Sequence, residues 1–145
     1  VIRRRGEKKD TVRNLESCGE CVVHVADEAL AEAMNLASGD WPYGVSEVEK
    51  TGLTAVASAR VRPPRIVESP VALECRVSQM LEVGEMPYSS TLVLAEVVWA
   101  HVREDVCAPS GAPDDARLHA IARMGGTRYA RTRDLFDLER PKVDG

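Results

Sequence analysis

Lys9, Asp10 and Thr11, three consecutive residues near the start of the chain, have side chains suited to binding an anion where a helix begins. The first N–H groups of a helix have no partners within it, and an ammonium and a hydroxyl beside them favour a phosphate group. The carboxylate of Asp10 would repel phosphate, so Asp10 is better suited to capping the helix. In a second interpretation, Lys9 to Thr11 form only a cap, and Arg3–Arg5 with Lys8 form a solvated arm.

The cysteines and histidines do not form a pattern typical of a metal site. Cys18 and Cys21 make one Cys-x-x-Cys, whereas a structural zinc site needs a second pair of ligands at short spacing. Ordinary buried thiols are favoured over a redox pair, because the motif does not begin a helix. We expect no metal ligand and no catalytic side chain. The absence of a secretion signal at the start favours a reducing, cytoplasmic compartment.

Short elements are expected to position these residues in the first half of the chain. Apolar residues recur there at helical spacing, and β-branched runs lie between breaks rich in Gly and Pro. The first predicted element is a helix that is capped by Asp10 or Thr11 and ends at Gly19, and a strand over 20–26 follows it. The next element is a helix over 28–37 capped by Asp27. A short helix over 46–51 and a short strand over 53–57 complete this half.

Two long strands are predicted in the second half. The first covers 66–82 with a break at Pro70, and the second covers 91–102. The second strand is apolar on both faces, so we expect it to be covered on both sides, by a barrel interior and by a helix or partner subunit. A loop over 105–114 and a helix over 114–122 should follow.

Three further features complete this part of the chain. Gly125-Gly126 should end the helix, and turns with short strands are expected over 129–143. Glu68 and Glu74 should lie on one strand face, and a solvated or ion-paired position is favoured for both.

Length and composition restrict the class of protein. The 145 residues fit a single domain over 1–145, and 44% apolar with 29% charged residues is a globular profile. No apolar run approaches the ~20 residues of a membrane-spanning helix. The net charge of −4 disfavours a general nucleic-acid binder, although the first sixteen residues are locally basic.

Short motifs along the chain occur in an order that resembles the flavin reductase-like family. Each motif alone is weakly specific, but the ordered set covers nearly the whole chain. The matching runs are KDTVRN at 9–14, GECVVH at 19–24, AEAMN at 31–35, GVSE at 44–47 with GLT at 52–54, ESPVALEC at 68–75, the strand over 92–102, and RMGG at 123–126 with YAR at 129–131.

The resemblance implies a mainly β fold with peripheral helices, the FMN-binding split β-barrel, usually in a homodimer. It implies bound FMN near the dimer interface and NADH or NADPH as hydride donor. Family members have further N-terminal strands before the first motif, so the resemblance implies an N-terminally incomplete chain. The flavin-binding residues that it implies are Lys9, Thr11, Asn14, Asn35, Arg123 and Tyr129.

Three functions remain open from the sequence. The first is an NAD(P)H-dependent FMN reductase, with a possible oxygenase or electron-transfer partner. The second is a non-catalytic FMN-binding electron carrier on the same fold. The third is a small barrel that binds nucleic acid through its basic arm, which the acidic net charge makes the least favoured.

Overall fold

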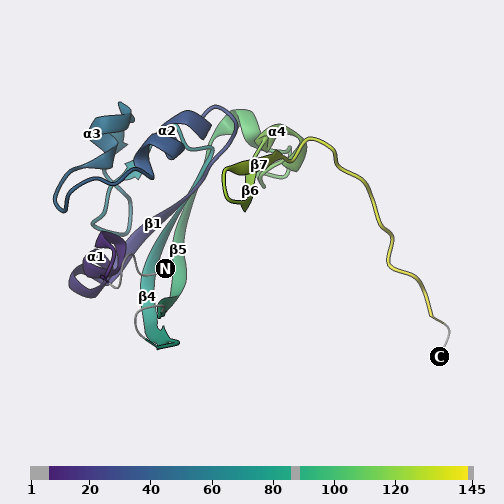
Figure 1. Ribbon diagram of the computed structural model, residues 1–145. Coiled ribbons are helices and arrows are strands. Elements are labelled where there is room, and N and C mark those ends of the chain that lie inside the picture. The colour runs from purple at the N-terminus through teal and green to yellow at the C-terminus, as the bar shows by residue number, and fades with distance from the viewer. Residues whose placement is uncertain (1–6, 86–88, 144–145) are drawn as a thin grey trace.

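A three-stranded antiparallel sheet forms the centre of the molecule (Figure 1). The structure, a computed structural model, describes residues 7–85 and 89–143, so the arginines of the expected basic arm lie outside the described residues. The strands are β1 (Glu20–Val25), β4 (Val71–Val83) and β5 (Ser90–Val102), in the order β1-β4-β5. The three strands predicted from the sequence are therefore present, and β4 begins directly after the break at Pro70.

Helix α1 (Asp10–Cys18) leads into β1. Val12 and Leu15, one turn apart, are its two buried residues, and Gly19 ends the helix in the left-handed conformation that glycine adopts readily. The expectation of a cap at Asp10 or Thr11 is wrong. The N-cap is Lys9, which makes no side-chain cap bond, because the helix already includes Asp10 in its first turn.

Two short helices lie above the sheet in Figure 1. They are α2 (Ala31–Ala37) and α3 (Glu47–Thr51). Helix α2 begins three residues later than predicted, because Asp27 organises a separate turn in which its carboxylate accepts from the amide of Leu30 at 3.0 Å. Ser46 caps α3, and its hydroxyl accepts from the amide of Glu49 at 3.4 Å.

A small hairpin joins the helices to the central sheet. It pairs β2 (Ala55–Val56) with β3 (Arg65–Ile66), so the strand predicted over 53–57 is shorter than expected. The amide of Ile66 donates to Nε2 of His24 on β1 at 2.9 Å. That bond ties the hairpin to the second half of β1, and the bonds of Arg62 to Glu20 tie the loop between β2 and β3 to the start of the same strand.

The prediction of a helix over 114–122 is wrong for its second half. After the 3-10 turn η1 (Glu104–Val106), helix α4 covers only Asp115–Leu118. His119 ends it with a φ of 45°, and the chain then enters β6 (Ile121–Gly125). The glycines at 125–126 turn β6 into β7 (Arg128–Arg131). β-pairing of Ile121 with Arg131 therefore replaces the expected last turn of the helix.

The described residues form a mainly β structure with a few helices, and their three sheets do not close into a barrel. The buried apolar side chains are few and lie on separate elements, with Val12 and Leu15 on α1, Val71 and Ala72 at the start of β4, and Val106 in η1. The expectation that 91–102 is covered on both faces is not met within one chain. Leu92, Leu94, Val97 and Trp99 of β5 remain exposed.

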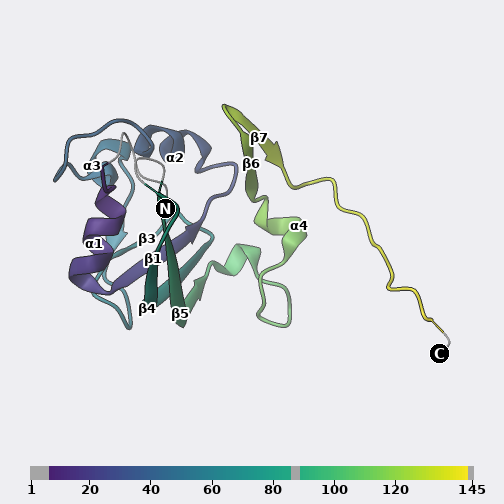
Figure 2. The ribbon, with the colours of Figure 1, turned by 60° about the horizontal axis from the view of Figure 1, so that its bottom comes forward.

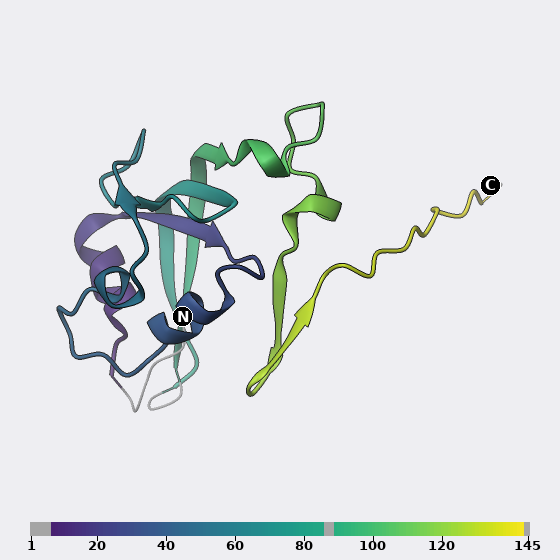
Figure 3. The ribbon, with the colours of Figure 1, turned by 90° about the horizontal axis from the view of Figure 1, so that it is seen from above.

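Residues 133–143 run beyond β7 as an extended segment, away from the central sheet (Figures 2 and 3). Residues 134–143 contain no helix or strand. Within the described ranges, none of the helices combines the length and apolar character needed to cross a bilayer.

Candidate functional site

An open groove runs between α1, the start of β1 and the loop that precedes β3. Its volume is about 520 Å³. The residues that line it are Thr11, Asn14, Leu15, Ser17, Cys18, Glu20, Cys21, Val22, Arg62, Pro63 and Pro64. The floor is therefore apolar, and one wall carries hydroxyl and amide groups while the other carries a guanidinium. This combination suits a ligand that has both a flat apolar part and an anionic end.

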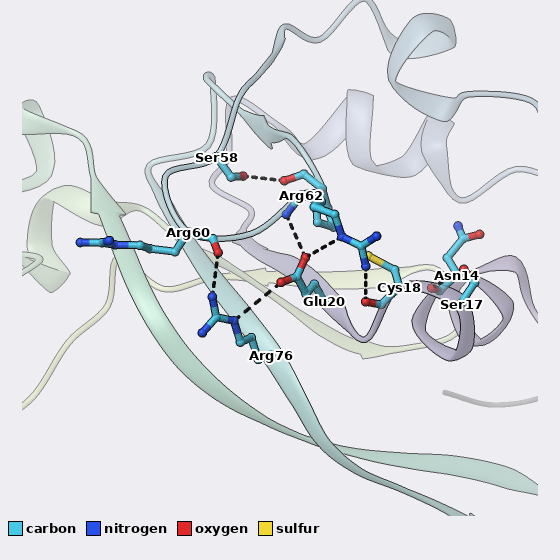
Figure 4. Close-up of polar contacts among 9 residues, drawn as sticks. Asn14, Ser17, Cys18, Glu20, Ser58, Arg60, Arg62 and Arg76 are labelled. Atoms are coloured by element: carbon cyan, nitrogen blue, oxygen red, sulfur yellow. Dashed lines mark hydrogen bonds and ion pairs between the residues drawn. The ribbon is translucent and has the colours of Figure 1, made fainter.

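Arg62 is held in place by groups of two different elements (Figure 4). Its Nε donates to the Glu20 carboxylate at 3.2 Å, and one Nη donates to the carbonyl of Cys18 at 2.7 Å. The amide of Arg62 also donates to Glu20, at 3.0 Å. A guanidinium has five N–H donors in one plane, so these bonds fix the plane without using its whole capacity.

Glu20 is the residue that organises this wall. Besides Arg62, its carboxylate lies 3.6 Å from Nε of Arg76 on β4. The amide and side chain of Arg62 donate to the carboxylate and hold the pKa of Glu20 below its usual value. In return, the bond to Glu20 raises the pKa of Arg62. Both groups therefore stay charged across the physiological pH range, and this wall of the groove carries the ion pair of Arg62 with Glu20.

Three of the six residues predicted to bind a cofactor lie at this groove or next to it. Thr11 and Asn14 line it from the exposed face of α1. Lys9 is exposed at the N-cap of the same helix. Thr11 and Asn14 lie on one side of α1, because residues three apart on a helix share a face. Whether they bind a phosphate stays a prediction.

The other three predicted residues lie elsewhere in the chain. Asn35 is exposed on α2, and Arg123 and Tyr129 belong to the β6–β7 hairpin. The guanidinium of Arg123 lies 5.9 Å from the ring centre of Tyr129, within range of a cation–π contact. None of the three lines the α1 groove.

A second, smaller groove of about 210 Å³ lies between the hairpin and the start of α2. It is lined by Tyr129 and by Ala31, one turn before Asn35 on α2. Its charged wall is Glu28, which accepts from Nε of Arg131 at 2.9 Å and from Arg133. These bonds lower the pKa of Glu28, with that from Arg133 the largest cause.

Of the two expected positions for Glu74, the solvated one is wrong, and the carboxylate lies within ion-pair distance of His101. The side chain of Glu74 is completely buried. It accepts from the amides of Ala59 and Arg60 at 2.7 and 2.6 Å and lies 2.6 Å from Nε2 of His101. Burial opposes ionisation, but these hydrogen bonds outweigh it and lower the pKa of Glu74 to about 2. Strand patterning alone did not reveal partners contributed by a distant loop.

The Cys21 thiol at the α1 groove is not activated. Cys21 faces Cys75 directly across the β1–β4 pair, and burial raises the pKa of both. All four cysteines are free. Among residues 7–85 and 89–143 no three His, Cys, Asp or Glu side chains converge to hold a metal ion.

Sequence reasoning missed Arg62 and Glu20, which the structure brings together from positions 42 residues apart. The one local signal was Pro63-Pro64, which follows Arg62 and fixes an extended backbone there. Such a signal indicates rigidity but not which carboxylate the arginine will reach.

Comparison with known proteins gives consistent matches. The family model for the flavin reductase like domain matches residues 3–113. An uncharacterized protein of Halalkalibacterium halodurans is 36% identical over 95% of this chain, and one of Deinococcus radiodurans is 37% identical over 93%. The chain spans 66% and 59%, respectively, of the length of these two relatives.

Solved structures agree with these matches. The nitrilotriacetate monooxygenase component B of Bacillus cereus is 32% identical and superposes with a TM-score of 0.88, over 95% of this chain and 69% of that one. Two more distant structures share the fold. A split barrel domain from Shewanella frigidimarina gives a TM-score of 0.79 at 20% identity, over 90% of this chain and 65% of that one. Flavoredoxin of Desulfovibrio vulgaris gives 0.75 at 18% identity, over 91% and 70%.

Proposed function

Because the chain belongs to the flavin reductase-like domain family, we propose that it binds FMN in the α1 groove and transfers a hydride from NADH or NADPH to the flavin. One observation carries the assignment of the groove. Arg62 is fixed by Glu20 and by the carbonyl of Cys18 at the wall opposite Thr11 and Asn14. A fixed guanidinium facing hydroxyl and amide donors is an arrangement that recognises a phosphate.

The residues of the groove fit the proposed cofactor in size and in chemistry. A volume of about 520 Å³ lies within the range of ~300–1,000 Å³ of small-molecule sites. The apolar floor, formed by Leu15, Val22 and the prolines, suits a flat ring system. Its donors come from two separate segments, α1 and the loop before β3, so an anion bound between them would be oriented as well as neutralised.

The residues of this chain would bind and orient the cofactor without supplying an acid or a base. When bound, FMN provides the hydride-accepting chemistry itself. Arg62, Thr11 and Asn14 hold its phosphate, and Lys9 adds positive charge at the first turn of α1. No side chain is proposed as catalytic.

Asn35, Arg123 and Tyr129 are proposed as further flavin contacts in a split-barrel homodimer. Within one chain they lie on α2 and the β6–β7 hairpin, outside the α1 groove. Pairing of two copies supplies a second set of these residues to each groove, which is why we propose the dimer together with the site. We also propose a cytoplasmic location, in agreement with the four free thiols.

The test is to load the purified chain with FMN, remove free flavin by gel filtration, and follow oxidation of NADH and of NADPH. We expect co-eluting flavin and oxidation of at least one pyridine nucleotide. FAD in a parallel sample shows which flavin is preferred. Absence of bound flavin in both samples would overturn the proposal.

A non-catalytic electron carrier is the second candidate, because flavoredoxin shares this fold. Bound FMN without oxidation of either pyridine nucleotide would favour the carrier. The likeness to a monooxygenase component makes an oxygenase the proposed recipient of the reduced flavin. Added oxygenase that raises the rate of pyridine nucleotide oxidation would support that partner.

A further inference from the structure

Two apolar surfaces of this chain have no apolar partner within the described residues. The first, which we name the arm face, consists of Leu81 and Val83 on β4 with Leu92 and Leu94 on β5. The second, which we name the tail, is the extended segment 133–143 with Leu135, Phe136 and Leu138. Each is unusual in a folded monomer, where large apolar side chains seldom gather without a partner.

The arm face is one continuous patch because of strand register. Leu81 lies directly opposite Leu92, and residues two apart on a strand point to the same side. The four side chains are 41–53% exposed, on the part of the long hairpin farthest from the core. No helix of the described chain covers this end of the sheet (Figure 1).

Part of the tail has the sequence pattern of a β-strand, although residues 134–143 pair with no strand within the described residues. Phe136 and Leu138 are 80% and 85% exposed, and their spacing of two places both on one side of an extended chain. Asp137 and Glu139 fall on the other side, together with Leu135, whereas Asp134 and Arg140 flank Phe136 and Leu138 on the first side. The alternation of one apolar and one charged side therefore covers residues 136–139.

The tail is fixed at its start rather than along its length. Arg133 donates to the Glu28 carboxylate through both Nε and Nη2, and the hydroxyl of Thr132 donates to the carbonyl of Ala120. From this anchor the tail leaves on the far side of the β6–β7 hairpin, away from the arm face of its own chain, in all three views (Figures 1 to 3).

We infer that the tail of one copy of this chain packs on the arm face of a second copy, and that the contact is reciprocal. The direction of the tail disfavours its own arm face, and two-fold symmetry makes each copy both donor and acceptor. The apolar part of the tail, residues 135–138, spans about 14 Å, which matches the length of the arm face along its strands. With a strip about 10 Å wide, two reciprocal contacts cover on the order of 560 Å² in total, so they form one part of the interface of the proposed homodimer, because stable interfaces bury ~1,200–2,000 Å².

This inference rests on the proposed homodimer, since it states which surfaces pair, but it does not depend on the flavin chemistry. A chain that binds no FMN yet forms the tail contact would overturn the proposed function alone. A flavin-binding chain without the contact would overturn the inference alone.

The first test is photo-crosslinking from position 136, where a benzophenone-bearing phenylalanine analogue replaces Phe136 with little change in shape. Isotopically heavy and light copies are mixed, irradiated and digested with trypsin. Cleavage after Arg76 and Arg103 leaves the entire arm face in one peptide, 77–103. We expect crosslinks from the tail peptide of one isotope to peptide 77–103 of the other. Crosslinks only within one copy, or none to this peptide, would overturn the inference.

The second test is complementation between two defective variants. A tail variant carries Phe136→Asp and Leu138→Asp, and a face variant carries Leu92→Asp and Leu94→Asp. We expect each alone to self-associate roughly 100-fold more weakly in sedimentation, as expected for loss of two large apolar side chains per contact. A mixture should form heterodimers, because the tail of the face variant can still occupy the face of the tail variant.

The matched control is Val67→Asp, which places the same charge at an exposed apolar residue after β3, outside both surfaces and outside the proposed flavin contacts. It should leave self-association unchanged. Circular dichroism identifies a face variant that fails to fold, and in that case the crosslinking result decides. Folded variants that associate no better when mixed than alone would contradict tail-on-face packing.

Discussion

Two glutamates on neighbouring strands hold opposite ends of the same loop, and the two ends differ in nearly every other respect. Glu74 of β4 accepts from the amides of Ala59 and Arg60, and Glu20 of β1 accepts from the amide of Arg62. The third partner of Glu74 is His101, and the cluster is closed to solvent at the carboxylate. The further partners of Glu20 are the guanidiniums of Arg62 and Arg76, both largely exposed.

The difference shows how one loop serves stability at one end and a site at the other. The buried end fixes the backbone, because amides without partners would be costly there. The open end uses the same kind of bond to orient an arginine that remains accessible from the groove. We therefore expect changes at Glu74 to act on stability and changes at Arg62 to act on ligand binding.

The largest expected effect follows removal of the buried carboxylate. Glu74→Ala removes the buried acceptor that the amides of Ala59 and Arg60 share with His101, so the free energy of unfolding should fall by about 2–4 kcal/mol. Urea unfolding followed by circular dichroism measures this change. The matched control is Glu96→Ala on β5, an exposed glutamate whose loss should cost less than about 0.5 kcal/mol. Equal losses in the two variants would remove the contrast between the two ends of the loop.

The next effect is expected at the open end. Arg62→Ala should raise the Kd for FMN roughly 10- to 100-fold, the value of a charge-assisted hydrogen bond. Arg76→Ala is a sharp control, because Arg76 also pairs with Glu20 but does not line the groove. Its flavin affinity should stay within about threefold of the unchanged chain. Fluorescence titration of FMN measures both, and an equal loss in the two variants would mean that Arg62 acts only through Glu20.

Local sequence patterns predicted the helices and strands of this molecule better than they predicted which distant side chains meet. Gly19 ended α1 as expected, and the β-branched runs at 20–26 and 91–102 formed strands, because both signals act within a few residues. The helix predicted over 114–122 failed because Ile121 pairs with Arg131 in a hairpin that helical spacing does not reveal.

The candidate site shows the same difference between local and distant contacts. Thr11 and Asn14 could be placed together because both lie on one helix face. Arg62 and Glu20 could not, since their contact is set by the path of the loop between β2 and β3. The buried position of Glu74 was also missed, because its amide partners come from that same loop.

A pH titration of stability sharpens the comparison further. The pKa of Glu74 is about 2 in the fold against an ordinary 4.5, so the unfolded chain binds more protons between these values. The stability that Glu74 contributes is thus complete above pH 4.5 and is lost as the pH falls towards 2. The slope from one such group is at most about 1.4 kcal/mol per pH unit. Glu74→Gln should flatten the slope in this window, as measured by urea unfolding at a series of pH values.

Glu20→Gln provides the contrast within the same titration. The pKa of Glu20 is also lowered, but its partners are exposed and screened by solvent. Its replacement should therefore change the slope much less than Glu74→Gln does. A larger change for Glu20→Gln would reverse the assignment of the stabilising end of the loop.

The smallest expected effect tests whether the groove reaches the first turn of α1. Thr11→Val removes a single neutral hydroxyl while keeping a β-branched shape, so the Kd for FMN should rise only about 2- to 10-fold. Thr51→Val is the control, because its hydroxyl donates only within α3, to the carbonyls of Glu47 and Val48. If both variants bind FMN like the unchanged chain while Arg62→Ala does not, the phosphate is held by the loop alone. The open end would then be a site made by one fixed arginine, and the helix would serve only to shape its wall.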